Sequence, residues 1–165
     1  MNTPLESQLK MHKKTSLTNL YFNRFLTVRY STAFFLFLNL YWAVFLMGSL
    51  SIAFVLPLML IVLATLTSFE QIRLYRNHKN HLRYASLFYR IMLIAIIVLI
   101  VSIFTPLFHF FFPFLKNSPE AINILLGILS VSLFFTILIL LKLKKIERNE
   151  DKHFKRIRAY QEIIN

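Results

Sequence analysis

The chain has 165 residues, of which 57% are hydrophobic, and its 19 Lys and Arg residues against 7 Asp and Glu give a formal net charge of +12. A chain this short and this apolar has room for one small membrane domain and little else. Because it contains no Cys, disulfides, thiolate metal sites and cysteine nucleophiles are excluded. The basic residues flank apolar stretches, so we expect them to meet anionic membrane lipids, and we expect no nucleic-acid partner.

Residues 1–30 are predicted to form a cytoplasmic or interfacial amphipathic segment. On a helical wheel that starts near Leu17, apolar side chains cover about half of the circumference, and Arg24 lies with Asn side chains on the other half. This pattern favours a helix that lies in the membrane interface or docks on the protein's own spans. The alternative is a simple cytoplasmic extension of the first span. No cleavable signal peptide is visible, so the first span would act as its own insertion signal.

The forty residues from Tyr30 to Phe69 contain no Lys, Arg, Asp, Glu or His. As a helix they would extend about 60 Å, which is about twice the hydrocarbon thickness of a bilayer. They are therefore predicted to form a transmembrane hairpin that turns at residues 48–51. Its two spans cover about 31–47 and 52–69.

Two residues inside this hairpin are candidates for a pore or for helix packing. Asn39 falls near the middle of the first span, where an amide side chain is expected to bond across to another helix. Pro57 has no N–H to donate to the carbonyl of Ala53 and is predicted to kink the second span.

Residues 70–90 form a basic connector between the two hairpins. His78 and His81 have a spacing that could place both on one helix face, but neighbouring cations and the lack of nearby carboxylates argue against a metal site. The cations predicted to bind lipid or a partner here are Arg73, Arg76, Lys79 and Arg83.

The third span is predicted at 91–112 and contains Pro106 and His109. Pro106 would free the carbonyl of Ser102, and Pro113 would end the helix. Tyr aside, His109 is the only ionisable side chain at or near membrane depth, and such a group is a functional candidate. We expect packing here, because the six neighbouring Phe residues favour a dry rim; the alternative is that Pro106 and His109 line a path.

The fourth span is predicted at 123–141, followed by a basic cytoplasmic tail at 142–165. The tail has the pattern of an amphipathic helix that lies on the membrane surface or against a partner, with an i, i+4 pair between Asp151 and Lys155. Its cations that are predicted to bind lipid or a partner are Lys144, Lys145, Lys155, Arg156 and Arg158.

The distribution of basic residues predicts the orientation. Of 19 Lys and Arg residues, 18 lie in the amino-terminal segment, the connector and the tail, and only Lys116 lies in the loop between spans three and four. Under the positive-inside rule both termini and the connector are cytoplasmic. The fold class is therefore predicted to be all-α: a multi-pass protein of the cell membrane with four transmembrane helices in two hairpins, an interfacial amino-terminal helix and a cytoplasmic carboxyl-terminal helix.

The sequence offers no catalytic constellation. All seven acids lie outside the predicted spans, and no GxGxxG, P-loop or HExxH motif occurs. We therefore expect no enzymatic activity and no cofactor. The lack of a membrane-embedded carboxylate also argues against a proton-coupled transporter.

Residues 21–30 and 39–42, with the sequences YFNRFLTVRY and NLYW, resemble small four-span membrane proteins of Gram-positive bacteria that are sometimes labelled as a cellobiose phosphotransferase component. The resemblance implies a bacterial cell membrane. A phosphotransferase subunit would need a phosphorylatable His or Cys in a formed site, and the sequence provides none, so the activity in that label is not carried over.

Three functions fit these observations. The first is a non-enzymatic accessory or scaffold subunit of a membrane complex, with a protein partner or self-association. The second is a homo-oligomeric channel or small transporter, and the third is a bacteriocin-immunity-type protein.

Overall fold

The computed structural model describes residues 4–76 and 82–164, and all regular elements of these residues are helices. The long helices are α1 (Pro4–Gly48), α2 (Val55–Arg76), α3 (Arg83–Ile103) and α5 (Pro119–Glu147), and the short ones are η1 (Ile52–Phe54), α4 (Phe108–Phe111) and α6 (Lys152–Ile164). Four stretches of the described chain are long and apolar enough to cross a membrane: Met11–Gly48, Ile52–Leu74, Arg83–Ile103 and Pro119–Glu162. The prediction of an all-helical chain with four candidate spans is confirmed.

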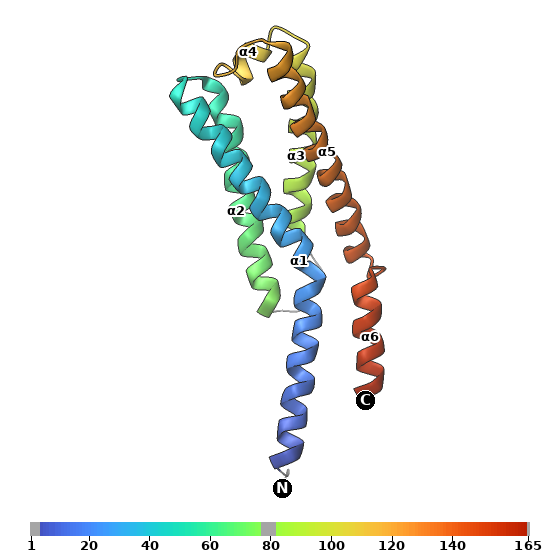
Figure 1. Ribbon diagram of the computed structural model, residues 1–165. Coiled ribbons are helices and arrows are strands. Elements are labelled where there is room, and N and C mark those ends of the chain that lie inside the picture. The colour runs from blue at the N-terminus through green and yellow to red at the C-terminus, as the bar shows by residue number, and fades with distance from the viewer. Residues whose placement is uncertain (1–3, 77–81, 165) are drawn as a thin grey trace.

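The long helices lie in two antiparallel pairs, α1 with α2 and α3 with α5, and α2 also packs on α3 (Figure 1). The short helix α4 and the turn after α1 lie at one end of the bundle. Both termini lie beyond the other end, where α1 extends past α2 and α6 runs beside α1 (Figure 1).

The amino-terminal segment is not a separate helix. α1 runs unbroken from Pro4 to Gly48, because residues 5–47 contain neither Pro nor Gly to interrupt it. Its apolar side chains Phe25 and Val28 are buried against the protein's own helices. The predicted amphipathic segment therefore continues directly into the first span, and part of its apolar side packs on the protein's own helices.

The predicted turn at residues 48–51 is present. The N–H of Ser51 donates to the carbonyl of Leu46 at 3.4 Å and that of Leu50 donates to Met47 at 3.2 Å, which is the bonding pattern of a Schellman motif. Leu50, with φ of 51°, occupies the left-handed position that usually belongs to Gly. Gly48 is the last helical residue instead.

Pro57 lies near the start of a candidate span and not in the interior of a helix. It is the third residue of α2, directly after η1, and N–H groups in the first turn of a helix have no carbonyl partner within the helix. Its missing donor therefore costs no hydrogen bond. The predicted kink at Pro57 is replaced by a helix start.

α3 begins and ends earlier than the sequence predicted. At its start, the Glu70 carboxylate of α2 accepts from the N–H groups of Tyr84 at 3.1 Å and Ala85 at 2.9 Å, so part of the expected connector is helix. At its end, α3 stops at Ile103 and not at Phe112. The carbonyl of Ser102 is not left free, because the N–H of Thr105 donates to it at 3.2 Å.

α5 also begins earlier than predicted, at Pro119, because the Ser118 hydroxyl accepts from the N–H of Ala121 at 3.3 Å and caps the helix. It ends in a second Schellman-type turn, in which Asn149 adopts φ of 57°. Asp151 then caps α6 by accepting from the N–H of Phe154 at 3.0 Å.

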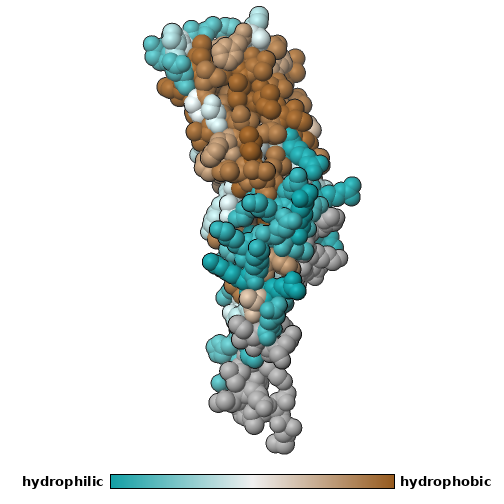
Figure 2. Space-filling model, turned by 90° about the vertical axis from the view of Figure 1, so that its right-hand side faces the viewer, coloured by the Kyte–Doolittle hydropathy of each residue, from teal (hydrophilic) through white to brown (hydrophobic). Residues whose placement is uncertain are grey.

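The outer surface has hydrophobic and hydrophilic zones. Figure 2 shows a continuous hydrophobic band in the half of the molecule that carries α4, with hydrophilic side chains at the tip beyond the band and again on its other side. Large apolar side chains of the candidate spans, such as Phe34, Phe134 and Val131, are more than half exposed. An apolar surface of this extent is suited to contact with lipid chains.

Candidate functional site

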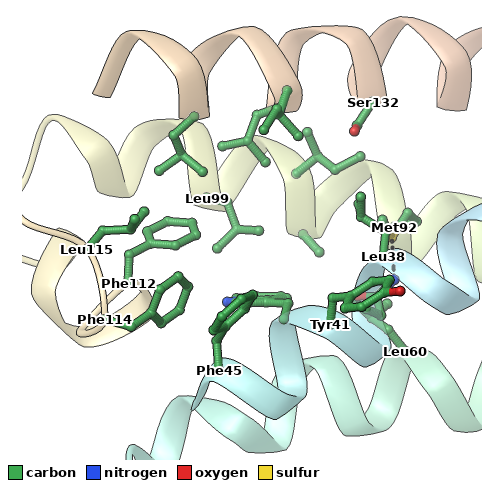
Figure 3. Close-up of a pocket in the computed structure, with 17 residues that line it drawn as sticks. Leu38, Tyr41, Phe45, Leu60, Met92, Leu99, Phe112, Phe114, Leu115 and Ser132 are labelled. Atoms are coloured by element: carbon green, nitrogen blue, oxygen red, sulfur yellow. Dashed lines mark hydrogen bonds between the residues drawn. The ribbon is translucent and has the colours of Figure 1, made fainter. Parts of the chain in front are cut away.

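An apolar cavity of about 190 Å³ lies between the two helix pairs, toward the end of the bundle that carries α4 (Figure 3). Figure 3 shows Phe45 of α1 facing Phe112 and Phe114 at one end of the cavity, and Met92 of α3 and Ser132 of α5 toward the other. All four long helices contribute to its wall.

The Phe-rich segment after α3 closes one end of this cavity. The ring of Phe112 stacks on Trp42 with centroids 6.1 Å apart, and the ring of Phe114 stacks on Phe45 at 5.1 Å. The indole N–H of Trp42 also donates to the carbonyl of Phe111 at 3.3 Å. These contacts fold the segment over the end of α1 and make this end of the bundle a packed aromatic rim.

The cavity wall carries little polar chemistry. Asn39 is buried, and its Nδ2 donates to the carbonyl of Phe35 at 2.7 Å and lies 3.9 Å from Sδ of Met92 across the helix interface. Tyr41 is the only titratable residue among those that line the cavity. The site can therefore hold an apolar group, but its lining offers no acid–base pair.

A polar cluster links three helices below the cavity. The Thr32 hydroxyl lies 3.1 Å from the Tyr89 hydroxyl and accepts from Nε2 of Gln71 at 3.1 Å. All three side chains are buried. The guanidinium of Arg29 donates to the backbone carbonyl of Gln71 at 3.1 Å. Since each of these groups bonds to another helix, the cluster fixes the register of α1, α2 and α3.

The most heavily bonded ionic site lies at the junction of α1, α5 and α6. The guanidinium of Arg24 is completely buried, and its Nη2 lies 2.6 Å from Oδ1 of Asp151. Its Nε donates to both carboxylate oxygens of Asp151, at 3.0 and 3.1 Å. The same Nη2 donates to the carbonyl of Ile146 at 3.0 Å and to Oδ1 of Asn149 at 2.9 Å.

An aromatic ring and the carboxyl end of a helix also contact the cation of this ion pair. The Phe154 ring lies 4.8 Å from the Arg24 guanidinium carbon, within the range of a cation–π contact. Arg24 also meets the carboxyl end of α5, where the helix dipole favours a cation. Nearby, Nζ of Lys142 donates to the Thr27 hydroxyl at 2.5 Å. The contacts of Arg24 with Asp151 and Phe154 hold α6 beside α1, and the Lys142 bond joins α5 to α1.

The four residues predicted as a pore or packing site do not gather in one place. Only Asn39 lines the cavity; Pro57 is buried at the start of α2. Pro106 is exposed in the turn between α3 and α4, and His109 is exposed on α4. Because α3 ends at Ile103 and α4 begins at Phe108, Pro106 and His109 do not lie together on one third-span helix as the sequence predicted.

The predicted basic residues lie on the surface wherever their side chains are described. Lys79, His78 and His81 lie outside the described residues, and the Arg76 side chain does as well. The exposed ones are Arg73, Arg83, Lys144, Lys145, Lys155, Arg156 and Arg158.

Sequence reasoning missed the site at Arg24 and Asp151. Arg24 falls on the polar half of its helical wheel, and Asp151 has an obvious local partner in Lys155. The available signal was the Asn149 turn, since Asn is common in the left-handed position that ends a helix and Asp is a favoured cap for the next one.

Comparison of the chain with protein-family models, with characterised proteins and with solved structures found no match.

Proposed function

We propose that the protein is a non-enzymatic, multi-span protein of the cell membrane with cytoplasmic termini, and that it serves as an accessory or scaffold subunit of a membrane complex. The observation that carries this proposal is the pairing of α6 with the extended start of α1 through the buried Arg24–Asp151 ion pair. We call this pair, residues 4–29 with α6, the two-helix stalk.

The stalk extends well past the membrane domain. Residues 4–29 form about 40 Å of helix, and Figure 1 shows that they continue beyond the ends of α2 and α3. Electrostatic attraction to lipid headgroups is screened within about 8–10 Å at physiological salt. Cations along the stalk are therefore better placed to meet an acidic surface of a protein than the membrane.

The described large apolar side chains of the tail are buried or partly buried. Ile157 is fully buried, and α6 packs along α1, whereas Lys152, Lys155 and Arg156 are exposed. A tail lying on the membrane surface would instead turn its apolar face to lipid. This arrangement favours a stiff, basic docking element, which is the second of the two roles that the sequence predicted for the tail.

The channel alternative has less support. The cavity between the helix pairs is lined mainly by apolar side chains, and every buried side-chain nitrogen or oxygen of the described residues has a hydrogen-bond partner. A path for ions needs polar groups that face water. The bacteriocin-immunity alternative is compatible with the stalk, but no contact or cavity favours it.

Reversing charge on the stalk should release a partner. Lys155→Glu combined with Arg156→Glu should lower the amount of protein that co-purifies in mild detergent by about tenfold, because the basic surface would then repel an acidic partner. Arg73→Glu combined with Arg83→Glu is the matched control, since it reverses the same number of exposed cations outside the stalk. Quantitative mass spectrometry of the purified samples measures the partner.

Two results would contradict the proposal. One is equal loss of the partner from the stalk variant and the control. The other is a pure homo-oligomer that conducts ions in liposomes, which would favour the channel.

A further inference from the structure

A second depression, of about 500 Å³, lies between α3 and α5 near the end of the bundle from which the stalk extends. We call it the α3–α5 groove. It is distinct from the cavity in Figure 3, because the two share no lining residue. The side chains from α3 are Ser86, Arg90 and Leu93, and the principal ones from α5 are Ile137, Leu141, Lys144, Glu147 and Arg148.

The groove is divided into a charged part and an apolar part. α3 and α5 run in opposite directions (Figure 1), so Arg90 near the start of α3 lies at the same end as Lys144 and Arg148 near the end of α5. Leu93 lies slightly less than one turn beyond Arg90, and Ile137 lies about two turns before Lys144, so both lie farther from that end of the bundle. Figure 2 shows the corresponding change on the molecular surface, where hydrophilic side chains begin directly beside the hydrophobic band.

The charged part has an excess of positive charge. Arg90, Lys144 and Arg148 are exposed, and no ion pair of the described residues joins any of them to a carboxylate. Glu147 also lines the groove, so three cations meet one anion. Arg side chains bind phosphate oxygens in a two-pronged geometry, and Lys adds a point charge.

The apolar part continues the site along α5. Ile137 is 41% exposed and Leu141 is 54% exposed, and they lie directly beside the cations of the same groove. A ligand that fills both parts must carry an anionic group joined to a long apolar chain. A soluble phosphate would occupy only the charged end.

We propose that the α3–α5 groove binds one anionic phospholipid, with its phosphate between Arg90, Lys144 and Arg148 and an acyl chain along Leu93 and Leu141. This inference rests on the membrane topology proposed above, but it does not require a protein partner. It assigns the lipid contact to a defined groove in the membrane domain and leaves the stalk for a protein.

The test measures lipid retained by the full-length protein purified in mild detergent and incubated with dioleoyl-phosphatidylglycerol or dioleoyl-phosphatidylcholine. Native mass spectrometry should show one phosphatidylglycerol per chain and little phosphatidylcholine. Arg90→Gln combined with Lys144→Gln should reduce the bound phosphatidylglycerol by about tenfold or more, because each cation near an anionic headgroup contributes to binding. Helical content measured by circular dichroism checks that this variant folds.

Lys155→Gln combined with Arg156→Gln is the control, since it removes two cations from the stalk and should leave lipid binding unchanged. Glycerol phosphate added in excess should not displace the lipid. Equal retention of phosphatidylcholine, unchanged binding in the groove variant, equal loss in the stalk variant, or displacement by glycerol phosphate would each overturn the proposal. Because this assay measures bound lipid and the partner experiment measures bound protein, the two proposals can fail separately.

Discussion

Arg24→Met should detach α6 from α1. The substitution leaves the Asp151 carboxylate buried without its cation and removes the bonds from Arg24 to Ile146 and Asn149. Breaking one side of a buried ion pair costs about 3–5 kcal/mol, which is more than the few apolar contacts of a short helix are expected to restore. The stalk should therefore open locally while the membrane domain stays folded. Limited proteolysis at residues 148–151 and the distance between spin labels on α1 and α6 measure the opening.

The matched controls separate this ion pair from general charge effects. Arg156→Met removes an exposed Arg from α6 and should change stability by no more than about 0.5 kcal/mol. Asp151→Asn keeps a good helix cap but leaves Arg24 unpaired, so it should also open the stalk. The double variant Arg24→Met/Asp151→Asn should lose less stability of the α1–α6 contact than the sum of the losses in the two single variants. Additive losses would show that the pair does not hold the stalk.

Phe35→Ala should destabilise the membrane domain more than any substitution on its lipid-facing surface. Phe35 is fully buried, and its ring packs edge-on against Tyr89 of α3 at 6.1 Å between centroids. Removing a buried Phe ring costs about 3–5 kcal/mol in soluble proteins. In a membrane the loss is smaller, about 2 kcal/mol, because the surrounding lipid is as apolar as the core and only packing is lost. Thermal unfolding in detergent measures it.

Phe37→Ala is the control for this substitution. It removes the same ring from the same helix, but Phe37 is 58% exposed, so its loss should change stability by about 0.5 kcal/mol or less. Equal destabilisation by the two substitutions would mean that Phe35 does not face the helix interface.

The apolar spans could be predicted from the sequence because they depend on length and composition alone. Forty uncharged residues are about twice as long as one crossing of a bilayer requires. The first hairpin and the position of its turn could therefore be predicted directly. The four candidate spans could be predicted without knowing which helices contact one another. The helix ends depend on local hydrogen bonds and were less predictable. Pro57 lies in the first turn of a helix and Pro106 lies in the turn after one, whereas the sequence predicted both inside spans.

The contacts between distant segments could not be predicted. Arg24 and Asp151 are far apart in the chain, and nothing in either local pattern indicates the other. The same holds for Thr32, Gln71 and Tyr89, which meet only because α1, α2 and α3 pack in one register. The helical wheel of residues 17–28 has an apolar and a polar half, but this pattern alone does not distinguish a membrane surface from another helix of the same protein. Arg24 lies on the polar half and is nevertheless completely buried.

The most direct measurement of the membrane topology is the reaction of single cysteines with a membrane-impermeant reagent in intact cells. The natural chain has no Cys, so each variant carries one reactive thiol, placed at Ser7, Asn80, Asn117 or Asn165. The distribution of Lys and Arg predicts that only the Asn117 position reacts from outside, and that the other three react after the cells are opened. Labelling of the Asn80 position from outside would contradict four spans with cytoplasmic termini.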